Sequence, residues 1–536
     1  MNDWDISPDR DLGGFGVAIA GPDSTAVTDA RRQALAADVP ARLMAGDATL
    51  WGAEAEPEAA IRLGWIDTTT RSRELLPRLA ALRAELLAEG LNRVVLAGMG
   101  GSSLAPEVIC ASAGVELTVL DTTDPGQVRA ALADRLAATV VVVSSKSGGT
   151  VETDSHRRAA FAALLDAGLS PTEAGRRFVV VTDPGSPLVD AAREMGAREV
   201  VLADPDVGGR YSALTAFGLV PSALAGADVT ALLDEADALA TGLAGDNPAL
   251  ALGCLLGTEA LAGRDKLVLV DSDPSLVGFG DWAEQLLAES TGKRSRCILP
   301  VVSPAAGHPA ADTVVVSTGE PVDGGTAMVT GPLGAQFLGW EYATAVAGRI
   351  LEINPFDQPN VTESKDNTAK LLASGLPGGD PQVRIGAVEV YADAELLADA
   401  TDLPGVLRSL VEKLPERGYL AVLAYLDRWT DAAAANLRGS LASWTERPVT
   451  FGWGPRFLHS TGQFHKGGPQ VGGFLQLTGA VEHDLAVPGK DYTFAGLQAA
   501  QAAGDLAALT GRGRPAVRLH LTDRAAGLGQ LSAALR

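Results

Sequence analysis

The central part of the chain alternates between short apolar runs and longer segments with apolar residues at helical spacing. The clearest run is the four valines at residues 140–143, which are too few for a membrane span and predict a fully buried strand of a parallel sheet. Similar runs lie within residues 91–109, 116–125 and 176–188, and each leads into turn residues or a helical pattern. Strands that alternate with helices at this spacing predict a doubly wound parallel sheet.

The pattern differs at the two ends of this region. Residues 1 to about 90 are rich in alanine, with leucines at helical spacing, and are expected to form helices that cap the domains. The helical pattern returns at residues 225–262, where we place a domain boundary. Further strands are expected at residues 266–273, 312–318, 383–392, 419–427, 447–454 and 516–523.

These patterns predict an α/β protein with two domains. At 536 residues the chain is too long for a single hydrophobic core, which agrees with this division. We expect a helical N-terminal segment at residues 1–85, a first αβα domain at 86–240, and a second αβα domain with helical extensions at 241–536.

Charge and cysteine content exclude several classes of partner and location. The net charge is −23 and Lys and Arg are not clustered, so a nucleic-acid partner is not expected. The three cysteines are widely spaced, without a C-x-x-C pair, and fit a reducing compartment better than a disulfide framework. The first residues are acidic where a signal peptide is basic, and no apolar run has the length of a membrane span. We therefore expect a cytoplasmic protein without a membrane partner.

Hydroxyl and glycine residues follow the valine run. Residues 144–150, SSKSGGT, carry four hydroxyls, two glycines and one lysine just before a helix expected to begin at Val151. A helix N-terminus offers unpaired backbone N–H groups and a partial positive charge, and both suit a phosphate group. An ordinary Ser/Gly-rich turn with a helix cap has the same composition, so both interpretations stay open at this point.

Two other stretches bear on cofactors. Residues 98–103, GMGGSS, resemble the dinucleotide fingerprint G-x-G-x-x-G, with Asp121 at the end of the next expected strand. Ser103 replaces the last glycine, however, which disfavours a nicotinamide cofactor. The TGK at residues 291–293 is not a Walker A loop, since Leu287 stands where the first glycine belongs. The six histidines are scattered and H-E-x-x-H is absent, so neither a metal nor another cofactor is expected.

Three charged residues have contexts that allow either chemistry or an ordinary surface role. Glu289 ends an amphipathic helical pattern, one turn after Gln285. Arg210 follows two glycines, which would let the backbone approach a ligand closely. Lys365 follows an extended stretch with two X-Pro pairs and lies near the start of an expected helix.

Taken together, five stretches resemble one family. In chain order they are GMGGSS, SSKSGGTVET, GGRYSALTAFGL, EQLLAESTGK and NPFDQPNVTESK. Their order and contexts resemble those of the glucose-6-phosphate isomerases, also called phosphoglucose isomerases. The length and the N-terminal region resemble the isomerase half of bifunctional transaldolase/glucose-6-phosphate isomerase proteins, without the transaldolase half. The resemblance implies two sugar isomerase (SIS-type) doubly wound αβα sandwich domains, a phosphosugar substrate, and a homodimer.

The resemblance also implies roles for the residues that match. Glu289 would be the catalytic base, Arg210 would stabilise the enediolate, and Lys365 would lie near the ring oxygen. The implied substrate-binding residues are Gly101, Ser102, Ser145, Lys146, Ser147, Thr150, Gln285 and Gln358. The second phosphate loop departs from the family pattern, because Ser147 and Gly149 stand where threonines are common.

The family's ring-opening histidine is harder to place. It lies in a G-x-x-G-Q-H context that precedes the lysine motif and comes from the neighbouring subunit. The nearest match here, HSTGQFHKGG, lies after Lys365 and has one extra residue before His465. We select His465 and interpret the difference as a changed order of elements in the second domain. His308, in the expected interval, lacks this context, and His459 is a further alternative.

The implied reaction is the reversible interconversion of glucose 6-phosphate and fructose 6-phosphate through a cis-enediol. A carboxylate such as Glu289 can move one proton between adjacent carbons, because it acts first as base and then as acid. An isomerase of another phosphosugar, for example one acting on both glucose and mannose 6-phosphate, is an alternative. A phosphosugar-binding regulator is another, but it would not need Glu289, Arg210 and Lys365 together.

Overall fold

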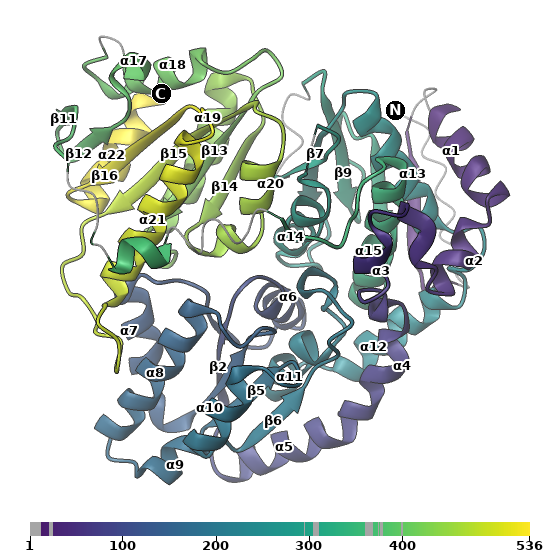
Figure 1. The fold of residues 1–536 in the computed structure, drawn as a ribbon, viewed down its shortest axis with the longest axis horizontal. Helices are drawn as coiled ribbons and strands as arrows, with labels where there is room; N and C mark the ends of the chain where they lie inside the picture. Colours follow the sequence, from purple (N-terminus) through teal and green to yellow (C-terminus); the bar gives the residue numbers. More distant parts are fainter. Residues whose placement is uncertain are drawn as a thin grey trace. The chain divides into compact units, whose positions relative to one another are not determined.

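The structure is a computed structural model, and it divides into two compact units. It describes residues 12–20, 25–293, 295–303, 310–359, 368–373, 375, 379–397 and 400–536. Unit 1 comprises Met1–Asp121 and Asp134–Asp357, and unit 2 comprises Thr122–Ala133 and Gln358–Arg536. Figure 1 shows the chain from its purple N-terminus to its yellow C-terminus.

The first sheet of unit 1 has five parallel strands in the order β3-β2-β4-β5-β6. The strands are β2 (Arg93–Gly98), β3 (Thr118–Leu120), β4 (Thr139–Ser144), β5 (Phe178–Thr182) and β6 (Glu199–Leu202). Every residue of β2, β4 and β5 is buried, which is why these strands are continuous apolar runs in the sequence. The strand order reverses between β2 and β4, because β3 lies on one side of β2 and all later strands lie on the other.

The second sheet of unit 1 has the order β1-β10-β9-β7-β8. The strands are β1 (Gly16–Ile19), β7 (Lys266–Asp271), β8 (Leu299–Ser303), β9 (Thr313–Thr318) and β10 (Ala327–Thr330). The last four are parallel, and β1 joins the edge of the sheet in the antiparallel direction. The N-terminal segment, expected to be helical throughout, therefore also contributes a strand.

Helices pack on both sheets of unit 1. The longer ones are α1 (Thr25–Ala36), α5 (Leu76–Ala88), α6 (Leu104–Ser112), α8 (Val151–Asp166), α10 (Pro187–Met195), α11 (Ala216–Ala225), α12 (Val229–Ala240), α13 (Pro248–Leu261), α14 (Phe279–Thr291) and α15 (Leu333–Ile350). The shorter ones are α2 (Val39–Met44), α3 (Glu56–Ala59), α4 (Thr68–Ser72) and α9 (Pro171–Gly175).

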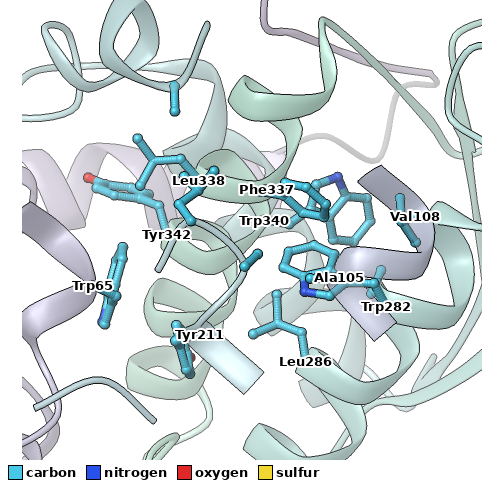
Figure 2. Close-up of a cluster of buried hydrophobic side chains, with 14 of the residues drawn as sticks. Trp65, Ala105, Val108, Tyr211, Trp282, Leu286, Phe337, Leu338, Trp340 and Tyr342 are labelled. Carbon is cyan, nitrogen blue, oxygen red and sulfur yellow. The ribbon is translucent and has the colours of Figure 1, made fainter. Parts of the chain in front are cut away.

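Helix α14 is fixed by a cluster of aromatic side chains. Trp282 packs edge-on against Phe337 of α15, with ring centroids 4.6 Å apart, and Leu286 belongs to the same buried cluster (Figure 2). Such aromatic pairs add about 0.5–1.5 kcal/mol beyond the burial of their area. This packing fixes the position of α14, the helix that carries Gln285 and Glu289.

Unit 2 contains one mixed sheet of six strands in the order β11-β12-β16-β15-β13-β14. The strands are β11 (Val383–Ile385), β12 (Val388–Tyr391), β13 (Tyr419–Tyr425), β14 (Val449–Trp453), β15 (Gly472–Gly479) and β16 (Ala516–Leu521). The four strands from β13 to β16 are parallel, and β11 and β12 form an antiparallel edge.

The helices of unit 2 lie on two faces of this sheet. An apolar cluster joins one face to α18 (Leu403–Glu412), α19 (Leu437–Thr445) and α22 (Arg524–Ala534). Helix α21 (Phe494–Thr510) packs on β15 and β16 and is not part of that cluster (Figure 1). This unit also contains α7 (Pro125–Ala133), α17 (Ala394–Leu397) and α20 (Gly462–Gly467).

The predicted fold class, an α/β protein with doubly wound parallel sheets, is confirmed. The strands expected from unbroken apolar runs are present, and residues 241–536 contribute strands to two sheets. The predicted domain bounds stay a prediction. Within the described part of the chain, every helix is too short or too polar to cross a membrane.

Candidate active site

The two predicted phosphate loops begin side by side. Gly98, at the end of β2, is the register partner of Ser144, at the end of β4. This is the point at which the strand order reverses, and open α/β sheets bind ligands outside the carboxyl ends of their strands at such a point. The structure therefore brings both predicted loops to one edge of the first sheet.

The first loop packs backbone against backbone with the segment that carries Arg210. A Cβ atom on Gly101 would lie only 1.9 Å from the carbonyl oxygen of Gly209, so no side chain fits at residue 101. Ser103 is buried, and its hydroxyl lies 3.4 Å from Asp121 Oδ2. The serine that departs from the dinucleotide fingerprint thus faces the buried carboxylate that a nucleotide ribose would need.

The second loop has its own internal contacts. Ser145 Oγ lies 3.0 Å from Thr150 Oγ1, which precedes helix α8. Lys146 Nζ donates to Asp183 Oδ2 at 2.6 Å and to the carbonyl of Pro205 at 3.1 Å. Ser147 is exposed. Hydroxyl groups and the α8 N-terminus therefore lie at this edge, while the lysine charge is balanced by Asp183.

Arg210 and Glu289 form a buried ion pair. Arg210 Nη1 lies 3.4 Å from Glu289 Oε2, and the two residues are only 1% and 5% exposed. Gln285 Nε2, one turn earlier on α14, donates to the other carboxylate oxygen at 3.3 Å. The structure thus brings together three of the predicted site residues, which come from two distant segments.

Three further contacts fix the Arg210 guanidinium. Its Nε donates to Ser290 Oγ at 2.8 Å, and its Nη2 donates to the carbonyls of Pro355 and Asp357 at 2.6 and 3.2 Å. Because each donor atom is engaged, the cation is oriented before any ligand arrives. A positioned cation beside a carboxylate is suited to a reaction in which a proton moves and negative charge develops.

Lys293 is a part of this site whose role sequence reasoning missed. Its Nζ donates to the carbonyl of Asn354 at 2.5 Å and forms an ion pair with Asp357. Burial, followed by the charge of Arg210, lowers the pKa of Lys293 to about 7. This lysine lies four residues after Glu289 in ESTGK, where the sequence excludes a Walker A loop and indicates no further role. Its burial was not visible in the sequence.

The other predicted residues are placed differently. Gln358 is exposed and belongs to unit 2, and Lys365 and His308 lie outside the described residues. His459 is half-buried at the end of a short 3-10 helix (Arg456–His459). Among the described residues, His, Cys, Asp and Glu side chains form no group of three or more that could hold a metal ion.

His465 is an interior residue of unit 2. It lies on α20 and is 1% exposed, and its Nδ1 is 3.0 Å from the hydroxyl of Tyr419. Burial, together with the charges of Lys466 and Arg514, holds its pKa well below the usual value. These surroundings describe a neutral, packed imidazole and give no support to the expected role in ring opening.

Comparisons with known proteins agree with the position of the site. Residues 85–302 match the family model for phosphoglucose isomerase. A glucose-6-phosphate isomerase of Thermosynechococcus vestitus is 37% identical over 218 residues, which cover 38% of this chain and 40% of that protein. A glucose-6-phosphate isomerase of Streptococcus pyogenes is 29% identical over 301 residues, covering 44% of this chain and 66% of the relative. The chain thus spans less than half the length of the first of these relatives.

Two solved structures are similar in fold. A glucose-6-phosphate isomerase from Chlamydia trachomatis has a TM-score of 0.54 at 19% identity, covering 69% of this chain and 92% of that one. A hypothetical protein from Thermus thermophilus has a TM-score of 0.52 at 26% identity, covering 65% and 95%. The resemblance to the transaldolase/isomerase proteins stays a prediction. The resemblance to the phosphoglucose isomerases is confirmed for residues 85–302, the region that contains both loops, Arg210 and Glu289.

Proposed function

We propose that this chain is a glucose-6-phosphate isomerase that interconverts glucose 6-phosphate and fructose 6-phosphate through a cis-enediol. The observation that carries the proposal is the buried pair of Arg210 and Glu289, with Gln285 on the second carboxylate oxygen. The pair lies in the segment that is similar to phosphoglucose isomerases.

The phosphate of the substrate would bind where the two loops meet. The backbone of Gly101 and Ser102, the hydroxyls of Ser145, Ser147 and Thr150, and the helix N-terminus at Val151 supply donors there, beside Lys146. Gly101 packs on Gly209, the neighbour of Arg210, so a phosphate held at this edge leaves the sugar carbons close to the ion pair. Fixing the reacting carbons near the base lowers the entropic part of the barrier.

Proton transfer would then depend on Glu289. The carboxylate takes the proton from C2 and, as the acid, returns it to C1. Arg210 stabilises the negative charge of the enediolate, which forms between these steps. Gln285 orients the carboxylate through its hydrogen bond to Oε1.

Ring opening is assigned to Lys365, with Gln358 near the substrate, on the resemblance alone. We do not include His465 in this step, because its Nδ1 is engaged by the Tyr419 hydroxyl and its pKa is held well below the usual value by burial and by the charges of Lys466 and Arg514. From the same resemblance we propose a homodimer located in the cytoplasm.

A coupled assay tests the proposal directly. Fructose 6-phosphate is supplied, and glucose 6-phosphate is detected by a dehydrogenase that reduces its nicotinamide cofactor. We expect turnover by the wild type and by Glu194→Gln, a matched change of an exposed glutamate on α10. Turnover of mannose 6-phosphate in a parallel assay would broaden the substrate range. A folded wild-type protein with no turnover of either sugar would favour a phosphosugar-binding regulator.

A further inference from the structure

One face of the sheet in unit 2 carries a group of polar residues although a helix covers it. Successive side chains of a strand point to opposite faces, and on three neighbouring strands the residues of one set belong to the apolar cluster. The other set contains the polar residues Glu389 and Tyr391 of β12, Gln476 and Thr478 of β15, and Arg518 and His520 of β16, with Phe474 and Ala516 at the start of the last two strands. Glu389 and Thr478 both lie opposite His520 in the register. A covered sheet face normally carries apolar residues, so the presence of these polar residues requires a physical explanation.

Helix α21 leaves space above these polar residues. It presents the small side chains of Ala495, Ala499, Ala502 and Ala503, which recur at helical spacing, and a cavity of about 270 Å³ lies between them and the sheet. Several lining residues on both sides are only half-buried, so the cavity can be reached from solvent.

One end of the cavity reaches the place in this fold where ligands commonly bind. In the sheet, β14 lies on one side of β13, and β15 and β16 lie on the other, so the strand order reverses between β13 and β15. Tyr425 ends β13, and Thr478 and Gly479 end β15, and all three line the cavity. Ligands of open α/β sheets bind outside the carboxyl ends of the strands at such a reversal.

Two residues that line the cavity each carry a buried donor nitrogen without a hydrogen-bond partner. Among the residues that the structure describes, the buried Nε of Arg518 and Nε2 of Gln498 have no hydrogen-bond partner. Gln498 is only 5% exposed, and leaving such a donor unpaired costs about 1–3 kcal/mol. A ligand that accepts hydrogen bonds would remove this cost.

The charges in the cavity favour an anion. The Arg518 guanidinium lies 4.1 Å from the centre of the Tyr391 ring, and burial lowers the pKa of both Arg518 and His520. Glu389 is the one acidic side chain in the lining, and it is already compensated by the Tyr391 hydroxyl at 2.8 Å and by an ion pair with Arg384. Glu389 also attracts Arg518, but Arg384 and Arg518 share this one carboxylate, so one positive charge remains in excess.

We propose that this cavity binds a small organic anion that bears hydroxyl groups, such as a short-chain sugar phosphate or hydroxy acid. The anionic group pairs with Arg518, Gln498 donates to its oxygens, and the carbon chain lies against the alanines of α21. All lining residues belong to unit 2 and lie outside residues 85–302, so this site does not depend on the proposed isomerase activity.

Alanine-methyl NMR of the 536-residue chain tests the proposed site directly. The protein carries ¹³C-labelled alanine methyl groups, and glycerol 3-phosphate and malate are titrated separately against a sodium chloride control. We expect saturable shifts of the Ala499 and Ala503 signals, while Ala507, exposed on the same helix, stays unchanged. A response to either anion supports the proposal. The anion that binds more tightly shows whether the site prefers a phosphate or a carboxylate. No saturable shift with either probe in the millimolar range overturns it.

Variants separate this site from the one in unit 1. Ala503→Leu fills the cavity and should abolish the shifts of the Ala499 signal, whereas Ala507→Leu, a matched change on the exposed face, should preserve them. Arg518→Gln should weaken binding at least about tenfold, since it removes a charged hydrogen bond. Arg210→Ala, which disables the proposed active site, should leave the shifts intact. Shifts that survive Ala503→Leu but vanish in Arg210→Ala would place the anion in unit 1 and overturn the proposal.

Discussion

Arg210 Nη1 lies 3.4 Å from Glu289 Oε2 in the interior of unit 1, and the two side chains come from residues 79 positions apart in the chain. Two charges are costly to bury unless they are paired and further hydrogen-bonded. Here Ser290, Pro355 and Gln285 supply those hydrogen bonds. The pair is thus held in one geometry by groups around it, and substitutions in it are expected to affect chemistry more than substrate binding.

Replacement of Glu289 tests the proposed base. Glu289→Gln keeps the size of the side chain and can still accept a hydrogen bond from Arg210, so we expect the variant to fold and to bind fructose 6-phosphate. Turnover should fall by about 10² to 10⁴, the usual loss when a general base is removed. Steady-state kinetics of this variant beside Glu194→Gln measure the effect. Retention of most activity would mean that the base lies elsewhere.

Replacement of Arg210 should lower kcat more than it raises KM. The charge that the guanidinium stabilises exists mainly in the transition state, so its loss is expressed in turnover. We expect Arg210→Ala to lose about 10² to 10³ in kcat. Arg210→Lys should recover only part of this loss, since an ammonium cannot reproduce four fixed contacts. An effect confined to KM would make Arg210 a binding residue.

Loss of the loop hydroxyls should affect KM more than kcat, the opposite of the effect expected for Arg210. Ser147→Ala and Thr150→Val each remove a donor proposed to contact the phosphate, which is bound alike in the ground and transition states. We expect KM to rise about tenfold with kcat nearly unchanged, because a hydrogen bond to a charged group contributes about 1.5–3 kcal/mol. Thr172→Val, on the exposed start of α9, is the matched control. A fall in kcat without a change in KM would contradict the phosphate assignment.

The strands that can be predicted from the sequence are those buried on both faces of a sheet. The valines of β4 form an unbroken β-branched run because every residue of that strand is buried. Strand β15 was missed because it begins with two glycines and carries Gln476 and Thr478 on its polar face. A strand of this composition is recognised only when its neighbours are known.

Some contacts of the candidate site can likewise be predicted from the sequence, and others cannot. The spacing of Gln285 and Glu289 on one helix is visible in the sequence. The spacing of residues along the chain does not predict that Glu289 lies beside Arg210. Only the family resemblance indicates that these two residues belong to one site. Lys293 and His465 are buried through tertiary packing, which the sequence does not show. A polar motif such as HSTGQFHKGG can therefore be predicted as a site although its histidine lies in the interior.

His465 is expected to act on stability rather than on turnover. His465→Gln removes one partner of the buried Tyr419 hydroxyl, which should lower the free energy of unfolding by about 1–3 kcal/mol. Tyr419→Phe removes the same hydrogen bond from the other side, and a double-mutant cycle should show that the two losses are not additive. Thermal unfolding and kcat are measured on the same samples. A large loss of kcat in a fully stable His465→Gln protein would restore the ring-opening assignment.

The lowered pKa of Lys293 predicts how the free energy of unfolding depends on pH. Burial and the nearby charge of Arg210 lower its pKa from the ordinary value of 10.5 to about 7, so the native state releases this proton more easily than the unfolded chain does. Between pH 7 and 10 the unfolded state therefore binds more protons at this position, and the contribution of Lys293 to the free energy of unfolding becomes more favourable as pH rises. At pH values below about 7 the lysine is charged in both states and the full cost of burying the charge remains.

Lys293→Met should remove this dependence. Denaturant unfolding of the wild type and the variant between about pH 7 and 10 should differ in slope by up to about 1.4 kcal/mol per pH unit, with the wild type gaining stability relative to the variant as pH rises. Lys413→Met, at the exposed end of α18, controls for the loss of one positive charge and should leave the slope of the wild type unchanged. Parallel profiles for the wild type and Lys293→Met would show that Lys293 stays protonated in the folded protein, and that its ion pair with Asp357 outweighs the cost of its burial.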